Sequence, residues 1–179
     1  PEYRGTVQTR HLITVLRDEL GLDKVKDSVT KPLSGVRVAI HYGCHLLKPR
    51  RIMQVDDPDH PTIFEDMLEA IGATPVDHAE RVICCGKSCR DCDLPETMTK
   101  TILESVNEAA VDVMGVICPS CFDSFDTGQL KIARKFDLGY TVPPVYFFQL
   151  LALAQGLQPA EVGLDKHKLK PTKLLENFA

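Results

Sequence analysis

Val36-Arg37-Val38-Ala39-Ile40-His41-Tyr42-Gly43-Cys44 begins with a short apolar run, residues 36–40, that leads into a glycine and a cysteine. Two later runs end in a similar way: residues 81–83 lead into Cys84-Cys85-Gly86, and residues 113–117 lead into Cys118-Pro119-Ser120-Cys121. Short apolar runs bounded by turn residues are typical of buried strands. If the three strands are parallel neighbours joined by helices, their carboxyl ends form one crevice and all five thiols point into it.

The pattern as a whole predicts an α/β fold: a small parallel sheet with helical crossovers and the cysteines at the carboxyl ends of the strands. Residues 46–61 are rich in proline and aspartate, which predicts an irregular loop over the crevice. Thr62 and Glu65 form a capping-box pattern at the start of the first crossover helix. Apolar residues at helical spacing predict helices over residues 6–20, 62–72, 96–113, 122–136 and 145–154.

We expect one soluble unit, because 179 residues with 44% apolar content suffice for one core. Its parts are an N-terminal helix and connection over residues 1–35, a cysteine-rich metal-binding domain over residues 36–156 and a peripheral polar segment over residues 157–179. The chain starts at Pro1 and lacks a secretory signal pattern, so we expect a cytoplasmic piece of a longer protein.

Charge and hydropathy argue against two classes of partner. The formal net charge of -4 is spread along the chain without long basic runs, so we expect no nucleic-acid binding. No stretch approaches the roughly 20 apolar residues that a membrane-spanning helix requires, so we expect no direct membrane span.

The cysteines favour metal binding over disulfides. Seven is an odd number, and the adjacent Cys84 and Cys85 do not suit a disulfide framework. Soft thiolates prefer zinc or iron-sulfur clusters among the common metals. Taken alone, the pair Cys118 and Cys121 fits either a zinc half-site or a redox dithiol. Five thiolates exceed the four that a tetrahedral zinc or a cuboidal cluster needs, which suggests an unusual cluster or a labile spare ligand.

Three segments carry a resemblance to a known family. His41-Tyr42-Gly43-Cys44-His45, Val116-Ile117-Cys118-Pro119-Ser120-Cys121 and the opening from Gly5-Thr6-Val7 to Arg10-His11-Leu12 are similar to the cysteine-rich CCG domain of the heterodisulfide reductase B subunit. The similarity covers most of the chain. That family carries two such repeats, and one is present here, so the resemblance implies that an N-terminal repeat is missing.

The resemblance implies a cofactor, a reaction and partners. It implies a noncubane four-iron (4Fe-4S) cluster that splits a disulfide, such as the coenzyme M-coenzyme B heterodisulfide of methanogenesis, in one-electron steps. The implied partners within the reductase complex are its flavin-containing A subunit and its ferredoxin-like C subunit. Single repeats in related proteins hold zinc instead. The implied ligands are Cys44, Cys84, Cys85, Cys118 and Cys121.

Other residues carry open alternatives. Residues 86–92 depart from the small, glycine-rich stretch expected after the family motif, so Cys89 and Cys92 are candidates for a second metal, an exchanging ligand, a dithiol pair or two free thiols. His41 and His45 flank Cys44 and are candidate ligands, proton donors or packing residues.

The remaining histidines and the loop cations favour structural roles. We expect surface or capping positions for His11, His60 and His78. Lys48, Arg50 and Arg51 suit either an anionic substrate tail or a solvated turn, with the turn favoured. The cluster Phe147-Phe148-Leu150-Leu151 predicts core packing.

Three functions therefore stand side by side. The first is the catalytic iron-sulfur subunit, or its C-terminal half, of a heterodisulfide reductase-like complex. The second is a structural zinc-binding domain that mediates the assembly of subunits. The third is a metal-free dithiol oxidoreductase that uses Cys118 and Cys121, and it requires a low thiol pKa.

Overall fold

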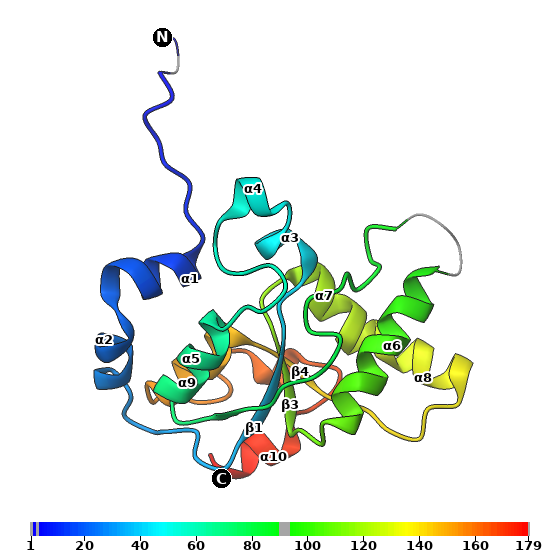
Figure 1. The fold of residues 1–179 in the computed structure, drawn as a ribbon. Coiled ribbons are helices and arrows are strands. Elements are labelled where there is room, and N and C mark those ends of the chain that lie inside the picture. The colour runs from blue at the N-terminus through cyan, green and yellow to red at the C-terminus, as the bar shows by residue number, and fades with distance from the viewer. Residues whose placement is uncertain (1, 3, 90–93, 179) are drawn as a thin grey trace.

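The computed structural model describes residue 2, residues 4–89 and residues 94–178. Its centre is a parallel sheet of four strands in the order β2-β1-β3-β4. The strands are β1 (Arg37–His41), β2 (Thr74–Pro75), β3 (Val113–Val116) and β4 (Pro144–Tyr146). Helices lie on both faces of this sheet (Figure 1). The predicted α/β class with a small parallel sheet is confirmed.

The helices divide between the two faces, with α2, α5 and α9 on one side and α6 and α8 on the other (Figure 1). Short helices α3, α4 and α7 follow the carboxyl ends of β1 and β3. The helical elements are α1 (Leu12–Val15), η1 (Leu16–Leu20), α2 (Leu22–Asp27), α3 (Cys44–Leu47), α4 (Arg50–Met53), α5 (Ile63–Ala70), α6 (Leu94–Glu108), α7 (Pro119–Asp123), η2 (Ser124–Gly128), α8 (Gln129–Phe136), α9 (Phe147–Ala154), η3 (Leu164–Lys166) and α10 (Thr172–Glu176).

Alternation along the strands creates two buried layers. Val38 and Ile40 face one hydrophobic cluster, whereas Ala39 between them belongs to the other. A β-carbon at Gly115 of β3 would lie 2.3 Å from Ile40 Cδ1, so glycine lets the two strands pack beneath the first cluster. Both faces of the sheet are covered, as continuous apolar strand segments predict.

The expected second strand is wrong. Residues 81–83 form a turn, and the sheet position beside β1 is occupied by Thr74–Pro75. The reason is that β1 ends at His41, and beyond it the Tyr42 amide donates a 2.9 Å hydrogen bond to the Arg81 carbonyl oxygen. Residues 81–83 therefore run alongside the chain past the end of β1 without joining a ladder.

Two element boundaries differ from prediction for local reasons. The first helix begins at Leu12 instead of residue 6, because residues 6–10 are exposed and the first buried side chain is Ile13. The last core helix begins at Phe147, because Pro144–Tyr146 pair with β3 as an edge strand. An edge position tolerates proline, which has no amide proton to donate.

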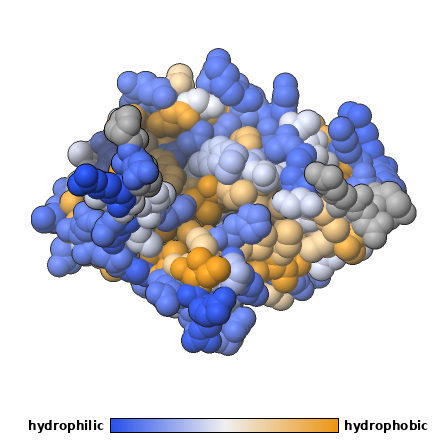
Figure 2. Space-filling view, turned by 90° about the horizontal axis from the view of Figure 1, so that it is seen from above, coloured by the Kyte–Doolittle hydropathy of each residue, from blue (hydrophilic) through white to orange (hydrophobic). Residues whose placement is uncertain are grey.

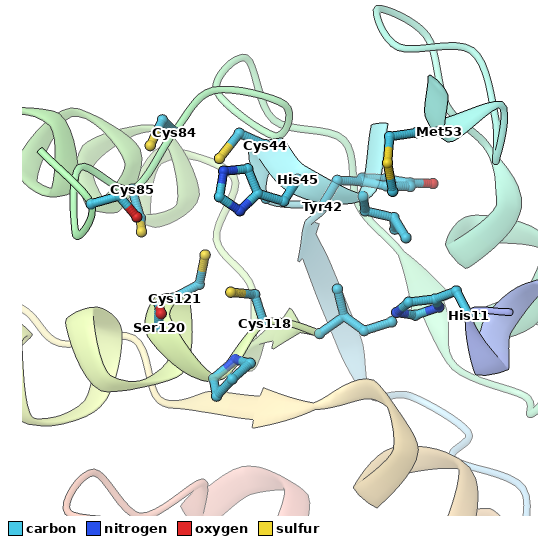
Figure 3. A pocket seen from close by; sticks show the side chains of 15 residues that line it. His11, Tyr42, Cys44, His45, Met53, Cys84, Cys85, Cys118, Ser120 and Cys121 are labelled. Carbon is cyan, nitrogen blue, oxygen red and sulfur yellow. The ribbon is translucent and has the colours of Figure 1, made fainter. Parts of the chain in front are cut away.

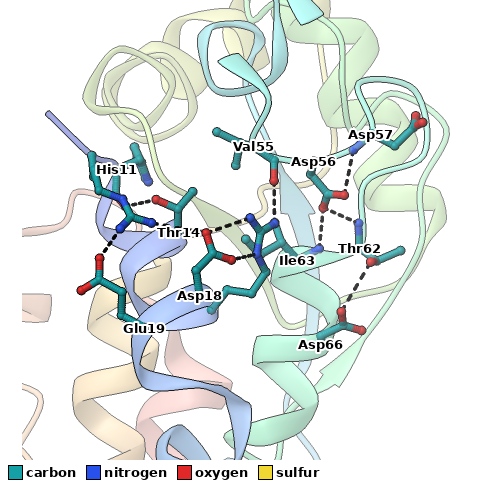
Figure 4. Close-up of polar contacts among 12 residues, drawn as sticks. His11, Thr14, Asp18, Glu19, Val55, Asp56, Asp57, Thr62, Ile63 and Asp66 are labelled. Carbon is teal, nitrogen blue, oxygen red and sulfur yellow. Dashed lines mark hydrogen bonds and ion pairs between the residues drawn. The ribbon is translucent and has the colours of Figure 1, made fainter. Parts of the chain in front are cut away.

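The loop over residues 46–61 contains two short helices, α3 and α4, and buries Leu46, Leu47 and Val55. The predicted capping box at Thr62 is also wrong, since the Thr62 side chain makes no capping bond. Instead, the Asp56 carboxylate accepts 2.8 Å hydrogen bonds from the amides of Thr62 and Ile63 (Figure 4). The loop thereby caps the helix that follows it.

The segment after residue 156 is attached to the core. Leu164, His167 and Leu174 are buried. The Asp126 carboxylate, itself buried, accepts hydrogen bonds of 2.9 and 2.8 Å from the amides of Lys168 and Leu169. This anchoring is closer than the polar composition suggested. Phe147, Leu150 and Leu151 are core residues, as predicted.

Candidate metal centre

A cavity of about 260 Å³ opens at the carboxyl ends of β1 and β3. Its lining includes the five cysteines of the sequence pattern: Cys44, Cys84, Cys85, Cys118 and Cys121. Their sulfur atoms point toward a shared space (Figure 3). From above, hydrophobic residues gather toward the hollowed middle of the molecule, within a largely hydrophilic border (Figure 2). Residues that are up to 77 positions apart in the sequence thus share one site.

Cys44 is positioned by the turn that ends β1. Gly43 has φ +72°, a conformation that favours glycine, and Cys44 begins α3 directly after it. A β-carbon at Gly43 would lie 3.5 Å from Cys121 Sγ. The turn therefore brings the β1 end into van der Waals contact with the segment that carries Cys121.

Cys84 and Cys85 are positioned by a turn at Gly86, not by a strand. Gly86 has φ +86°, and a β-carbon there would lie 2.7 Å from Pro95 Cα. Its amide donates a 3.3 Å hydrogen bond to Cys84 Sγ. Thr99 Oγ1 donates to the Cys85 carbonyl oxygen at 2.7 Å, which ties this turn to α6. Because the backbone turns here, two adjacent cysteines line one cavity.

Cys118 and Cys121 are positioned by the start of a helix. Cys118 follows β3 as the N-cap residue of α7, Pro119 takes the first helical position, and Cys121 lies three residues after Cys118. The cap and the first turn bring both thiols to the same end of the sheet. The helical run continues through η2 and α8 to Phe136, so the positive end of its dipole lies beside these two sulfurs.

The thiols differ in how readily they lose a proton. Hydrogen bonding from Cys121, together with Ser124, lowers the pKa of Cys85 to about 6. Burial, followed by the hydrogen bond with Cys84, raises the pKa of Cys44 to about 11. The pKa of Cys121 is raised by its hydrogen bond to Cys85 and by burial. Crowded thiols resist accumulating negative charge, and a bound cation would remove that resistance.

The donor set fits an iron-sulfur group. Within the described residues, no group of three or more histidine, cysteine, aspartate or glutamate side chains lies close enough to hold one ion. The five sulfurs instead line the wall of a cavity. Such spacing suits a ligand larger than a single ion, and iron-sulfur clusters are held by cysteine thiolates.

The predicted histidines occupy different places. His45 is exposed and lines the cavity. His41 lies outside the lining: it is 1% exposed and packs edge-on against Phe125 at 5.0 Å between ring centroids. Neither of its ring nitrogens has a hydrogen-bond partner in the described structure. Burial lowers the pKa of His41 to about 3, so the ring is neutral.

Sequence reasoning missed some of the site. His11, expected to be a surface or capping residue, both caps α1 and lines the cavity. Met53 also lines it, from the loop after Cys44. A histidine eleven residues into the chain has no local signal for this role, because only the packing of α1 against the core brings it there.

Several other predictions have a clear outcome. His78 is buried instead of exposed, and its Nε2 lies 3.0 Å from the Ile40 carbonyl oxygen. Lys48 lies 3.9 Å from Asp59, and Arg50 lies 4.0 Å from Asp57, within an exposed turn. Cys89 does not line the cavity. Cys92 lies outside the described residues.

The CCG family of cysteine-rich domains matches residues 38–126, the part of the chain that holds all five cavity cysteines. The chain belongs to the CCG cysteine-rich domain family. The CCG chain is 37% identical over 178 residues to the protein named as the B subunit of the ferredoxin/F(420)H(2)-dependent CoB-CoM heterodisulfide reductase of Methanosarcina acetivorans, with 97% of this chain and 59% of the relative covered. The predicted relation to the heterodisulfide reductase B subunit is confirmed.

A second relative has a different role by name. The protein called 8-methylmenaquinol:fumarate reductase membrane anchor subunit, of Wolinella succinogenes, is 31% identical over 177 residues, which cover 96% of the CCG chain and 61% of the relative. The chain thus spans about three fifths of the length of either relative. Among the described residues, no helix combines the length and apolar character needed to cross a bilayer.

One solved structure shares the fold. The crystal structure of a hypothetical protein from Helicobacter pylori aligns with a TM-score of 0.59 at 12% identity, over 83% of this chain and 28% of that one. At this identity the likeness extends to the fold alone. The relatives named as reductase subunits indicate an oxidoreductase-related role within a complex of several subunits.

Proposed function

We propose that this chain is the CCG part of a protein like the heterodisulfide reductase B subunit, holding a noncubane 4Fe-4S cluster and reducing a disulfide such as the coenzyme M-coenzyme B heterodisulfide. The ligands are Cys44, Cys84, Cys85, Cys118 and Cys121. The observation that carries the proposal is that these five thiols line one cavity. The flavin-containing A subunit and the ferredoxin-like C subunit supply the electrons, and the complex is cytoplasmic.

Disulfide reduction consumes two electrons and two protons and releases two thiols. When bound, the cluster supplies electrons singly and offers iron to a substrate sulfur. The chain itself binds the cluster through its thiols, shapes the cavity and limits water. Tyr42 and Leu46, both buried, form part of the wall that encloses the reacting sulfur. His45, exposed at the cavity, is in position to exchange protons with solvent.

The zinc alternative fits the geometry less well. A structural zinc site needs four ligands converging at about 2.0–2.3 Å from one point. The described side chains include no such group of three, and the cavity holds a fifth thiol. The dithiol alternative requires a low pKa at the Cys118/Cys121 pair, whereas the pKa of Cys121 is raised.

Metal analysis tests the proposal directly. The chain is purified without oxygen, and iron, acid-labile sulfide and zinc are counted per chain. EPR of an oxidised, thiol-treated sample is expected to show a paramagnetic iron cluster. Stoichiometric zinc with no iron, and no EPR signal, would establish the structural zinc domain instead.

Two cysteine variants test the ligand set. Cys85→Ser is expected to lose the cluster, because Cys85 is buried within the cavity wall. Cys89→Ser is the matched control, because Cys89 lies three residues beyond Gly86 and outside the cavity lining. Equal and complete loss of iron from both variants would show that the ligand assignment is wrong.

A further inference from the structure

The cavity has two unlike walls. The thiols line one side, while His11 and Met53 lie on the other, with Leu46 and Ile117 among the apolar lining residues (Figure 3). A cluster bound to the thiols leaves this second wall facing the remaining space. The second wall is mainly hydrocarbon and thioether, with one imidazole. It therefore suits the carbon part of an organic molecule whose polar atom meets that imidazole.

The hydrogen bonds of His11 fix its tautomer. Its Nδ1 accepts a 3.2 Å hydrogen bond from the Ile13 amide as the N-cap of α1. Burial lowers its pKa, so the ring is neutral near pH 7. A neutral imidazole that accepts at Nδ1 carries its proton on Nε2. Within the described part of the chain, Nε2 has no hydrogen-bond acceptor.

The His11 ring is held in place by its surroundings. Thr14 Oγ1 donates a 2.7 Å hydrogen bond to the His11 carbonyl oxygen, and Ile13 is fully buried in the core (Figure 4). Arg17, one turn later, donates a 2.5 Å hydrogen bond to the Val55 carbonyl oxygen and so ties the helix to the loop that carries Met53. The ring reaches from the start of α1 toward the space that the thiols face (Figure 3). A donor in a preset position binds a ligand at little cost in entropy.

We propose that His11 is a ligand-binding residue whose Nε2–H donates a hydrogen bond to the sulfur of a small organic thiol or disulfide in this cavity. The alkyl part of that molecule lies against Leu46, Met53 and Ile117. The inference rests on the proposed function for the class of ligand and adds the residue that recognises it. His11 thereby pairs with the thiol wall: one side holds the inorganic group, and the other orients the organic sulfur.

Two substitutions separate the roles of His11. Asparagine is among the best N-cap residues, so His11→Asn keeps the cap that Nδ1 provides but does not reach the cavity. Glutamine extends further, so His11→Gln restores a donor near the position of Nε2. His60→Asn is the matched control, because His60 is an exposed histidine that does not line the cavity.

The probes are 2-mercaptoethanol for binding and 2-hydroxyethyl disulfide for turnover. Binding is measured by anaerobic titration calorimetry, which reports affinity whichever metal the chain holds. His11→Asn is expected to bind the thiol about fivefold more weakly, the change that the net value of one neutral hydrogen bond produces. His11→Gln recovers part of this loss, and His60→Asn binds as wild type does. KM for the disulfide rises in His11→Asn, while the iron content and EPR signal stay unchanged.

Two results distinguish this inference from the proposed function. If the chain holds zinc and no iron, the proposed function fails, and the calorimetric comparison still tests His11. If His11→Asn binds 2-mercaptoethanol as tightly as wild type, with an equal thermal midpoint, the inference is overturned while the cluster assignment stands. Should His11→Asn unfold, the comparison of His11→Gln with wild type decides: a change in KM and affinity at equal iron content supports the inference, and no change overturns it.

Discussion

Glu65 connects two of the cysteine segments, and its replacement has a calculable effect. The Tyr42 hydroxyl, fully buried, donates to Glu65 Oε2 and accepts from the Phe64 amide at 3.2 Å. Arg81 lies 3.5 Å from Glu65 Oε1. Because Tyr42 precedes Cys44 by two residues and Arg81 precedes Cys84 by three, the Glu65 carboxylate connects both turns.

The expected loss in Glu65→Leu follows from these contacts. A buried hydroxyl left without an acceptor costs about 1–3 kcal/mol. Arg81 keeps its 2.9 Å contact with Asp77, whose side chain is 77% exposed, so losing the Glu65 contact adds about 0–1 kcal/mol. The free energy of unfolding should therefore fall by about 2–3 kcal/mol, which for a chain of this length lowers Tm by about 4–12 °C.

Urea denaturation followed by circular dichroism measures this change, with Asp77→Asn as the control. Asp77→Asn removes the other carboxylate beside Arg81 without touching Tyr42, so its effect should stay within about 0.5 kcal/mol. Glu65→Gln keeps an acceptor for Tyr42 and should fall between the two. If Glu65→Leu proves as stable as Asp77→Asn, leucine packing has offset the lost hydrogen bond and the proposed connection between the turns is refuted.

Three further changes test other features of the molecule. Gly86→Ala should cost about 1–3 kcal/mol and lower iron content, because its β-carbon would lie 2.7 Å from Pro95 Cα at φ +86°; equal iron content in mutant and wild type would contradict this. Asp126→Ala should cost about 2–3 kcal/mol by leaving the Lys168 and Leu169 amides unpaired, and limited proteolysis should then cut the C-terminal segment first. Burial lowers the pKa of His41 from 6.5 to about 3, so below pH 6.5 the unfolded chain binds more protons and the free energy of unfolding falls with pH. His41→Leu should make that fall shallower in thermal unfolding from about pH 7 to 4, and an unchanged slope would show that other groups dominate.

Local sequence was informative wherever one physical signal dominated. Residues 37–41 and 113–116 form strands because apolar residues facing both layers leave no other arrangement that buries them. The helix at 63–70 follows from its apolar spacing. Residues 81–83 misled because a short apolar run packs equally well as a half-buried turn, and only the length of β1 determines whether a partner strand forms.

The cysteine pattern could be interpreted from sequence because strand ends and glycine turns fix where the sulfurs emerge. Cys44 and Cys118 follow strands directly, and Gly86 permits the turn at Cys84 and Cys85. Soft sulfur donors in that number already limit the chemistry to a few metals. The sequence by itself thus determined the layered α/β class, the metal-binding character and the family.

Tertiary structure alone determined the opposite wall of the cavity. His11, Leu46 and Met53 meet the thiols because a helix N-cap, an inter-helix loop and a strand end pack against the same core. Their placement depends on contacts such as Arg17 with Val55 and Asp56 with Ile63, which join residues 38 and seven positions apart. Contacts across such separations leave no local pattern in the chain, since their energy is gained only once the whole core has formed.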